Sequence, residues 1–422
     1  MTSFTHRQRM LAALKGQIVD RLPWVPRLDL WYNAHKRAGT LPAPYQQASL
    51  HEITDALDWG FHAVIPQFKN VRSPADECHR ALGVYNLSTM PYATVFENVA
   101  VTMESVGDDT CVTYRTPKGT IRTRVRHDEA MRRAGITISH IQEHAIKEPA
   151  DYAAVAWLFD NARVTPNAEG YARFAAEVGE RGCAVGFVSL AGSPMHLLLR
   201  ELMPFDQFFY ELSDHPDELA ACATSIGRYY ERVFTTVAES AADIFLFGAN
   251  FDAAITYPPF FDEHIKPWLR KFADLLHPRG KLLLTHPDGE NTGLLDSFLD
   301  SGMDIADSIC PAPMTRLNLR QVREHFGSRI SILGGFPSVA LLPEAMSERA
   351  FEAYVDEFFG QLGTGDRQVL GISDTTPPGA DFQRLVALGE RARAFRPGCG
   401  EAPVNTTFPP TTGVDAHQAG WL

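Results

Sequence analysis

Short apolar runs alternate with longer stretches in which hydrophobic residues recur at helical spacing, and this alternation continues over most of the chain. The first pattern is typical of buried strands and the second of amphipathic helices. Strands are expected at residues 23–28, 62–66, 184–189, 243–247, 281–285, 303–307, 330–333 and 368–372. Helices are expected at residues 50–57, 195–203, 216–238, 258–276, 292–301, 317–325, 347–361 and 382–395. Eight strands, most of them followed by a helix, predict an α/β fold, a closed (β/α)8 TIM barrel.

One segment departs from this alternation. Residues 94–126 are rich in Val and Thr, alternate between polar and apolar positions, and contain the turn sequences Gly-Asp-Asp and Pro-Lys-Gly. This pattern predicts an inserted layer of antiparallel β-hairpins between the second and third barrel strands, serving as a lid or as the surface of a homodimer. We expect residues 1–396 to form a single barrel domain with this insertion, and residues 397–422 to form a C-terminal extension.

Composition narrows the class of protein. The 422 residues include 45% hydrophobic and 21% charged residues, which is enough for a large core. A formal net charge of −12 argues against a nucleic-acid partner, which would favour a basic face. Every apolar stretch falls short of the roughly 18–20 residues that span a membrane. The first ten residues lack the apolar core of a secretory signal, and the six cysteines form no Cys-x-x-Cys pair, so a cytoplasmic location is expected.

The expected strand at residues 281–285 ends in a cluster of polar residues, with the sequence Thr-His-Pro-Asp-Gly-Glu. The carboxyl ends of strands that alternate with helices are the places where ligands bind. His286 and Asp288, two residues apart at such an end, would project to the same side and could face one metal ion or one substrate. Zinc accepts both kinds of ligand. In the alternative interpretation, His286 caps the next helix and Asp288 is a solvated loop residue.

Two other strand ends carry similar side chains. Asn250 and Asp252 follow the expected strand at residues 243–247 and could orient a polar substrate; an Asx-turn is the alternative. Asp374 follows the last expected strand and precedes a double proline. It could supply a third anionic metal ligand or an acid/base group, and capping of the next helix is the alternative.

The end of the first expected strand offers a different set. Arg27 could supply a cation, Asp29 a carboxylate and Tyr32 an aromatic wall to a substrate in the barrel mouth. An Arg27–Asp29 ion pair with a purely structural role is the alternative.

The order of these pieces resembles the uroporphyrinogen decarboxylase superfamily over most of the chain. The likeness rests on residues 5–32 and 256–309, and on the sequences TYRTPKGTIRTRV, HPDELAACATSIGRYY and ILGGFPSVALLPE. It implies a barrel with its site at the strand carboxyl ends. True uroporphyrinogen decarboxylases bind a tetrapyrrole through clustered arginines and an aspartate near the N-terminus. Here the first strand offers only Arg27 and Asp29, so that activity is not expected.

The other branch of the superfamily comprises corrinoid-linked methyltransferases. Some members bind zinc through a His-x-Cys pair and a further Cys after the last strand. This sequence has His286 and Asp288 at the pair and Ser373-Asp374 in place of the last Cys. Without thiolates the site is harder and more Lewis-acidic, which favours an oxygen substrate such as a methyl ether over a thiol.

The resemblance therefore implies a corrinoid-dependent methyltransferase of the O-demethylase type. It would move a methyl group between a small oxygen-containing substrate, such as a methoxylated aromatic, and a corrinoid carried on a separate protein. Catalytic and metal-binding roles, with zinc as the expected metal, fall to His286, Asp288 and Asp374. Substrate binding falls to Arg27, Asp29, Tyr32, Asn250 and Asp252. A cofactor-free or metal-assisted decarboxylase or lyase of a small acid, and a non-catalytic ligand-binding relative, are the alternatives.

Overall fold

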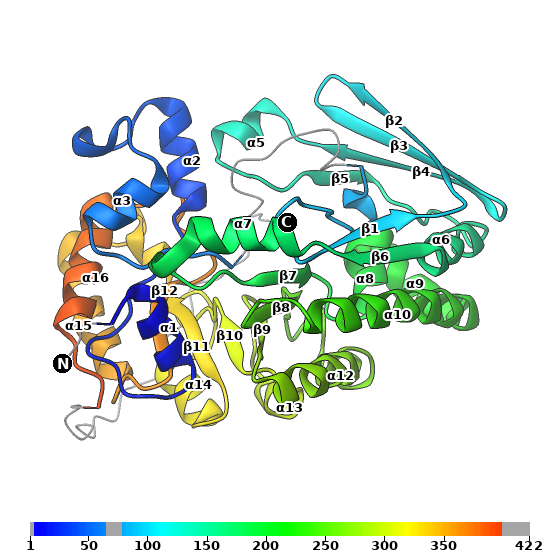
Figure 1. Ribbon diagram of the computed structural model, residues 1–422. Coiled ribbons are helices and arrows are strands. Elements are labelled where there is room, and N and C mark those ends of the chain that lie inside the picture. The colour runs from blue at the N-terminus through cyan, green and yellow to red at the C-terminus, as the bar shows by residue number, and fades with distance from the viewer. Residues whose placement is uncertain (1–3, 65–77, 399–422) are drawn as a thin grey trace.

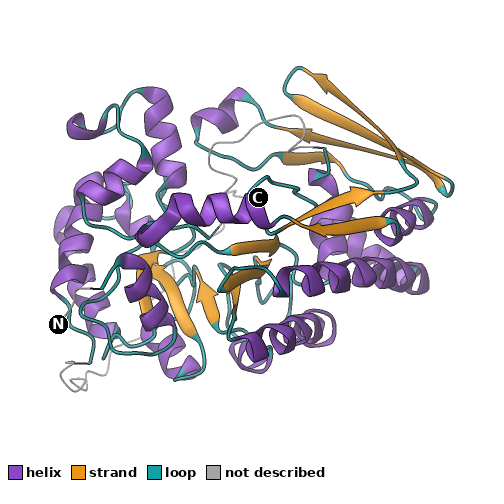
Figure 2. Cartoon of the chain, in the orientation of Figure 1, coloured by secondary structure: helices purple, strands orange, loops and turns teal. Residues whose placement is uncertain are grey.

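The computed structural model describes residues 4–64 and 78–398, and its centre is a six-stranded parallel sheet (Figure 1). Neighbouring strands follow the order β12-β11-β10-β9-β8-β7. Their bounds are β7 Gly186–Ser189, β8 Ile244–Ala249, β9 Leu282–His286, β10 Ile305–Asp307, β11 Ser331–Phe336 and β12 Gln368–Ile372. Nearly every residue of these strands is buried, because helices surround the sheet as in other parallel folds (Figure 2). All six lie where the sequence predicted strands.

All eight expected helices are present around the sheet, together with further helices between residues 6 and 214 that were not among the expected ones. The α-helices are α1 His6–Leu14, α2 Asp29–Ala38, α3 Leu50–Ala56, α5 Glu129–Arg133, α6 Asp151–Asp160, α7 Ala168–Val178, α8 Pro194–Leu197, α9 Phe205–Asp214, α10 Pro216–Ala238, α11 Pro258–Phe260, α12 Lys266–Leu276, α13 Leu295–Asp300, α14 Leu319–Phe326, α15 Glu348–Gln361 and α16 Phe382–Ala394. The 3-10 helices are η1 Ala43–Tyr45, η2 Arg80–Leu82, η3 Gly179–Arg181, η6 His277–Arg279 and η7 Ser338–Leu341. The 23-residue α10 has the predicted bounds.

Two expected helices are interrupted by π-helical turns, η4 Leu198–Leu202 and η5 Phe261–Ile265. In the second case Pro267 follows two residues after the turn. Proline has no N–H to donate to the carbonyl of Glu263, so the regular helix cannot continue through this turn. The first π-turn lies beside the candidate site described below.

The first two expected strands are not part of the regular sheet. At residues 23–28, Trp24 forms an isolated parallel bridge with Leu370 of β12. Pro23 and Pro26 flank this bridge, and neither can donate a backbone hydrogen bond, so a continuous ladder cannot form there. Residues 62–64 of the second expected strand have no strand geometry, and residues 65–66 lie outside the described residues. The described sheet therefore has six strands, and closure into an eight-stranded barrel stays a prediction.

The predicted antiparallel insertion is confirmed and is larger than expected. Strand β1 (Tyr92–Phe96) pairs antiparallel with β6 (Ala162–Pro166). A separate four-stranded sheet has the order β2-β3-β4-β5, with β2 Ala100–Val106, β3 Asp109–Thr116, β4 Gly119–Arg126 and β5 His140–Glu143. This sheet projects at the upper right of Figure 1, with β2 exposed along its whole length. A role as lid or dimer surface stays a prediction, as do the domain bounds; residues 399–422 of the expected extension lie outside the described residues.

None of the helices in the described residues is long and apolar enough to cross a lipid bilayer.

Candidate functional site

Four strands of the parallel sheet, β8, β9, β10 and β12, bring polar side chains to the same edge of the sheet. His286 is the last residue of β9 and Asp307 the last of β10, while Asn250 follows β8 and Asp374 follows β12. The parallel strands align these carboxyl ends, and Asn250 N donates to the backbone oxygen of His286 at 2.8 Å. We call His286, Asp288, Asp307 and Asp374 the His286 cluster.

Asp307 fixes the orientation of the His286 ring. His286 Nδ1 lies 2.6 Å from Asp307 Oδ2, and both side chains are almost fully buried. The other ring nitrogen, Nε2, faces Asp374 Oδ1 at 3.4 Å and Asp288 Oδ2 at 3.7 Å. Burial disfavours the imidazolium, but the charges of Asp288 and Asp307 outweigh it and raise the pKa of His286 to about 10. At neutral pH the ring therefore carries a proton on Nε2, directed at two carboxylates.

The protonation of His286 should be visible in the pH dependence of stability. The pKa of His286 is about 10 in the folded chain and 6.5 ordinarily. The ion pairs of His286 therefore contribute fully to the free energy of unfolding below pH 6.5, and this contribution is lost as the pH rises through 10. In chelator-treated protein, we expect the free energy of unfolding to fall by a few kcal/mol more between pH 7 and pH 10 in the wild type than in His286→Asn. Denaturant titrations at both pH values measure this difference. Parallel pH profiles for the two proteins would contradict the assignment.

The two carboxylates that face Nε2 differ in acidity. Burial raises the pKa of Asp288, the charge of His286 opposes that shift, and the neighbouring charge of Asp374 adds to it. Burial also disfavours the charged form of Asp374, but the hydrogen bond with His286 and the charge of Arg27 hold its pKa below the usual value. Two carboxyl groups whose pKa values are pushed apart are typical of sites that perform acid/base chemistry.

Three residues of the site, which follow β8, β10 and β12, have strained backbone conformations. Asn250, Ser308 and Asp374 have φ angles of 56°, 60° and 56°, in the left-handed region that non-glycine residues rarely adopt. Such strain persists where the surrounding structure requires it and is common at functional sites. In this conformation Asn250 Nδ2 donates to both oxygens of Asp288, at 3.0 and 2.9 Å. The strained turns therefore serve to aim side chains into the His286 cluster.

Arg27 joins the cluster from the first strand segment. Its Nη1 donates to Asp374 Oδ1 at 3.0 Å, and its Nε lies 3.5 Å from Asp29 Oδ1. Burial works against the guanidinium charge, but Asp29 and Asp374 raise the pKa of Arg27. The sequence left two roles of Arg27 open, a structural ion pair with Asp29 and a place in the site. The structure shows both contacts together.

Two predicted substrate-binding residues, Tyr32 and Asp252, form hydrogen bonds with backbone groups outside the His286 cluster. The Tyr32 hydroxyl donates to the backbone oxygen of Ala48 at 3.1 Å. Asp252 accepts hydrogen bonds from the backbone N–H of Glu290 and of Ala254, both at 2.8 Å, and so forms the capped turn that was the alternative. The structure does not bring these two side chains to His286.

Sequence patterns missed three residues of the site. Asp307 is the last residue of the expected strand at residues 303–307, and a carboxylate at that end was the available signal. His62 lies with Nε2 at 3.7 Å from Asp307 Oδ1, whereas His286 contacts the other carboxylate oxygen, Oδ2. Arg200, on the π-turn η4, donates through Nη1 to Asn250 Oδ1 and gave no signal because its segment has the pattern of an ordinary helix.

The cluster fits a divalent cation. Within the described part of the chain, His286, Asp288 and Asp374 each offer one ligand atom, and these atoms lie within 4.8 Å of one another. Asp307 occupies Nδ1 and leaves Nε2 for the metal, which is the usual carboxylate–histidine arrangement of metal sites. One nitrogen and two carboxylate ligands suit zinc with an open position.

If the cluster binds zinc, Asp288→Asn and Asp374→Asn should each weaken the affinity at least about tenfold, because an amide is a poorer ligand than a carboxylate. Competition with a chromogenic chelator measures the affinity directly. Asp252→Asn is the matched control, since this carboxylate caps a turn beside the cluster. Equal affinities for wild type and both variants would remove the metal from the site.

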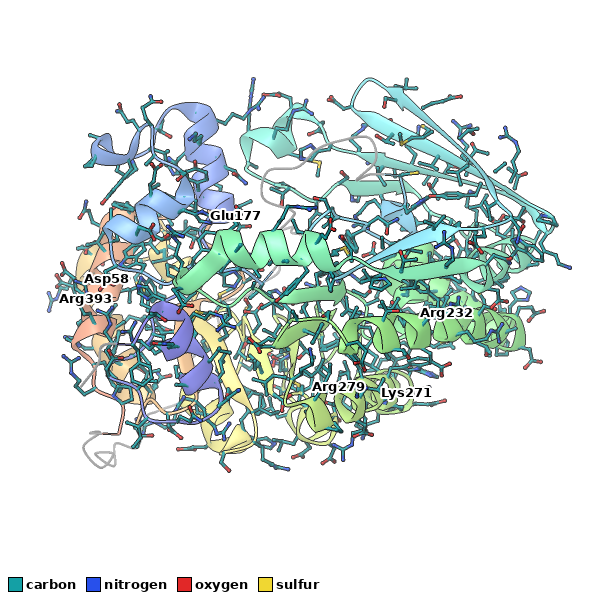
Figure 3. All side chains as sticks on the ribbon, viewed as in Figure 1. Asp58, Glu177, Arg232, Lys271, Arg279 and Arg393 are labelled. Atoms are coloured by element: carbon teal, nitrogen blue, oxygen red, sulfur yellow. The ribbon has the colours of Figure 1, made fainter. Side chains whose placement is uncertain are left out.

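A cavity of about 790 Å³ lies elsewhere, against α1 and the end of α16. Several of its charged residues form ion pairs, among them Arg9 with Asp20 at 2.7 Å and Arg393 with Asp58 at 3.5 Å (Figure 3). No residue of the His286 cluster lines it. The convergent strand ends, with their shifted pKa values, identify the better candidate site.

The similarity of this chain to known proteins lies in its fold. No protein-family model and no curated protein matches the sequence. Among solved structures, a methyltransferase from Methanosarcina mazei matches with a TM-score of 0.51 and 16% sequence identity. The match covers 93% of this chain and 98% of that chain. The two proteins therefore share an α/β fold along nearly their whole lengths.

Proposed function

We propose that this chain is a methyltransferase of the O-demethylase type, which moves a methyl group from a small oxygen-containing substrate to a corrinoid on a separate protein. The observation that carries the proposal is the placement of His286 at the carboxyl edge of the sheet, with Nδ1 on Asp307 at 2.6 Å and Nε2 facing Asp374 at 3.4 Å. The raised pKa of His286 follows from this placement. The shared fold with a protein named as a methyltransferase adds support.

The proposed step is the cleavage of a methyl–oxygen bond. An alkoxide or phenoxide leaves slowly unless a proton reaches the oxygen as the bond breaks. His286 donates its Nε2 proton to that oxygen, while the methyl group passes to the reduced cobalt of the acceptor corrinoid. The electron pair of the broken bond stays on the oxygen, which leaves as a hydroxyl group. Asp307 stabilises the imidazolium before the step, and solvent returns the proton afterwards.

The other residues position the substrate for this step. Asn250 donates a hydrogen bond to Asp288, and Arg27 donates one to Asp374, so both carboxylates are fixed in place beside His286. A zinc ion on His286, Asp288 and Asp374 would supply Lewis-acid polarisation of the same oxygen in place of the proton. Zinc would occupy Nε2, so proton donation by His286 and polarisation by zinc are alternative forms of the site.

We also propose that the sheet closes into a (β/α)8 barrel through the first two strand segments. Four backbone hydrogen bonds support this closure. Leu370 N donates to Pro23 O at 2.9 Å, and Gly60 N donates to Trp24 O at 2.9 Å. Phe61 N donates to Arg181 O at 2.8 Å, and Val185 N to Ala63 O at 3.2 Å. These bonds run from β12 through both segments to the residues before β7.

Product analysis tests the proposed reaction. The protein is incubated with aryl methyl ethers and chemically reduced cobalamin, and phenol and methylcobalamin are quantified by mass spectrometry. We expect both products in equal amounts, and neither without reduced cobalamin. A decarboxylase would instead release carbon dioxide without any corrinoid, and that result would replace the proposal.

A further inference from the structure

The four-stranded sheet of the insertion has one protected edge and one open edge. At the first edge, β5 is only four residues long, and its pairing with β4 is interrupted by a register shift at Arg124 and Val125. At the second edge, β2 has seven residues, all exposed, and pairs in unbroken register with β3. Proteins commonly protect a sheet edge with a short strand, a bulge, lysine or proline, because an open edge pairs with other strands. Strand β2 has none of these four features.

We propose that β2 pairs antiparallel with β2 of a second copy of this chain and so joins the two insertion sheets into one. Among the described residues, β2 has β3 as its only strand partner, and Figure 1 shows β2 along the outer rim of the projecting sheet. A two-fold axis would use the open edge of both copies at once, so the assembly closes as a dimer. The protected strands β5 would form the two outer edges of the joined sheet. This inference is independent of the proposed reaction.

The apolar side chains of β2 favour one register of this pairing. Val101 and Met103 lie on one face of the sheet, and their partners in β3, Tyr114 and Val112, are buried. On β2 the same apolar face is open, with Val101 36% and Met103 37% exposed. If Thr102 lies on the two-fold axis, Val101 comes opposite the partner's Met103, and Thr102 comes opposite the partner's Thr102. Cross-strand pairs of both kinds stabilise antiparallel sheets.

Charged residues on the other face of the sheet favour the same register. Arg115 lies opposite Ala100 in the β2–β3 pairing, and its Nη1 donates to Thr102 Oγ1 at 3.4 Å. The guanidinium therefore extends over β2, the strand at the open edge. With Thr102 on the axis, the partner's Glu104 comes opposite Ala100 and next to this guanidinium. Glu104 and Arg115 would form two equivalent ion pairs across the axis.

Neighbouring registers are less favourable. With Met103 on the axis, Val101 would lie opposite the partner's Ser105, and the ion pairs would be lost. With Glu104 on the axis, two carboxylates would face each other, which destabilises a sheet. The contact between two seven-residue strands is small beside the roughly 1,200–2,000 Å² that a stable dimer buries, so we expect association in the micromolar range.

Sedimentation velocity of the full chain tests the dimer. The wild type should change from monomer to dimer between about 1 and 100 μM. Glu104→Arg places a like charge beside the partner's Arg115 and should raise the dissociation constant by about tenfold. Combining Glu104→Arg with Arg115→Glu restores opposite charges and should return the constant to within about threefold of the wild type. Arg122→Glu is the control, because Arg122 lies on the same face of the sheet but on β4, away from the open edge; it should behave as wild type.

Disulfide formation tests the register. Residues that lie opposite each other in antiparallel strands have Cα atoms about 4.5–5.5 Å apart, which a disulfide can bridge. Thr102→Cys should therefore form a covalent dimer under mild oxidation. Ser105→Cys should not, because its two copies would lie about six positions, or about 20 Å, apart along the strands. The oxidised wild type measures the background from the native cysteines.

Three results would overturn the inference. The first is a wild type that stays monomeric up to about 100 μM. The second is a dimer that Glu104→Arg does not weaken. The third is a Thr102→Cys variant that forms no more covalent dimer than Ser105→Cys. Misfolding cannot imitate the expected result, because the charge-swapped double variant must regain the dimer that Glu104→Arg loses, and circular dichroism checks that each variant is folded.

Discussion

Replacing His286 with asparagine is expected to lower the rate of methyl transfer at neutral pH by about a hundredfold or more, while the chain stays folded. The asparagine amide reaches the position of Nδ1 and can still donate to Asp307, which accepts from His286 at 2.6 Å. It has no atom at the position of Nε2. The variant therefore keeps the buried hydrogen bond and loses the proton that faces Asp288 and Asp374.

Alanine is a poorer choice at this position. Asp307 is fully buried, and burial opposes its charge, but His286 holds its pKa well below the usual value. His286→Ala would remove the hydrogen-bond partner at 2.6 Å from that carboxylate and leave His62 at 3.7 Å, at a cost of up to about 3–5 kcal/mol in the free energy of unfolding. The matched control is His277→Asn, since His277 pairs with Asp304 at the opposite end of β10, at 2.9 Å. A folded His286→Asn variant with near-normal turnover would exclude His286 as the proton donor.

The second large effect is expected for Asp307→Asn. This change keeps the volume but removes the charge that supports the imidazolium, so the pKa of His286 should fall from about 10 toward its ordinary value. Methyl transfer at neutral pH should decrease by about a hundredfold, because less of the acid form is present and the ring tautomer is no longer fixed. The pH profile should also change, with its alkaline limb moving to lower pH.

The pH profile of methyl transfer distinguishes an effect of Asp307 on His286 from a general loss of structure in the site. Asp307 acts through His286, so a general loosening of the site would lower the rate at every pH without moving the alkaline limb. Asp304→Asn is the control, because Asp304 directly precedes the amino end of β10 and pairs with His277. An unshifted alkaline limb in folded Asp307→Asn would contradict the role given to this residue.

The sequence could predict those site residues that come at or directly after the ends of strands. His286, Asp288 and Asp374 follow clear apolar runs, and the alignment of parallel strands brings them together. Asn250 was predicted on the same basis and donates to Asp288. Periodicity locates such ends to within a residue or two, and that precision is sufficient when the polar residues follow the run directly.

Other features depend on contacts that no local pattern contains. Asp307 belongs to the apolar run itself, so its contact with His286 becomes evident only when β9 and β10 are paired. The turn that Asp252 caps involves Glu290, 38 positions away. The π-turn that carries Arg200 has the hydrophobic spacing of a regular helix. The six regular strands were predictable, whereas the prolines of the first segment replaced a ladder with a single bridge at Trp24.

In the proposed reaction, a proton on His286 Nε2 drives methyl transfer from oxygen to a corrinoid. The most direct test of this step is a single-turnover experiment, in which protein and a panel of aryl methyl ethers are mixed anaerobically with free cob(I)alamin and the loss of the cob(I)alamin spectrum is followed. We expect methylcobalamin to form with at least one ether in the wild type and in His277→Asn, and about a hundredfold more slowly in His286→Asn. No methylcobalamin with any ether in folded wild type, or equal rates in wild type and His286→Asn, would contradict the claim.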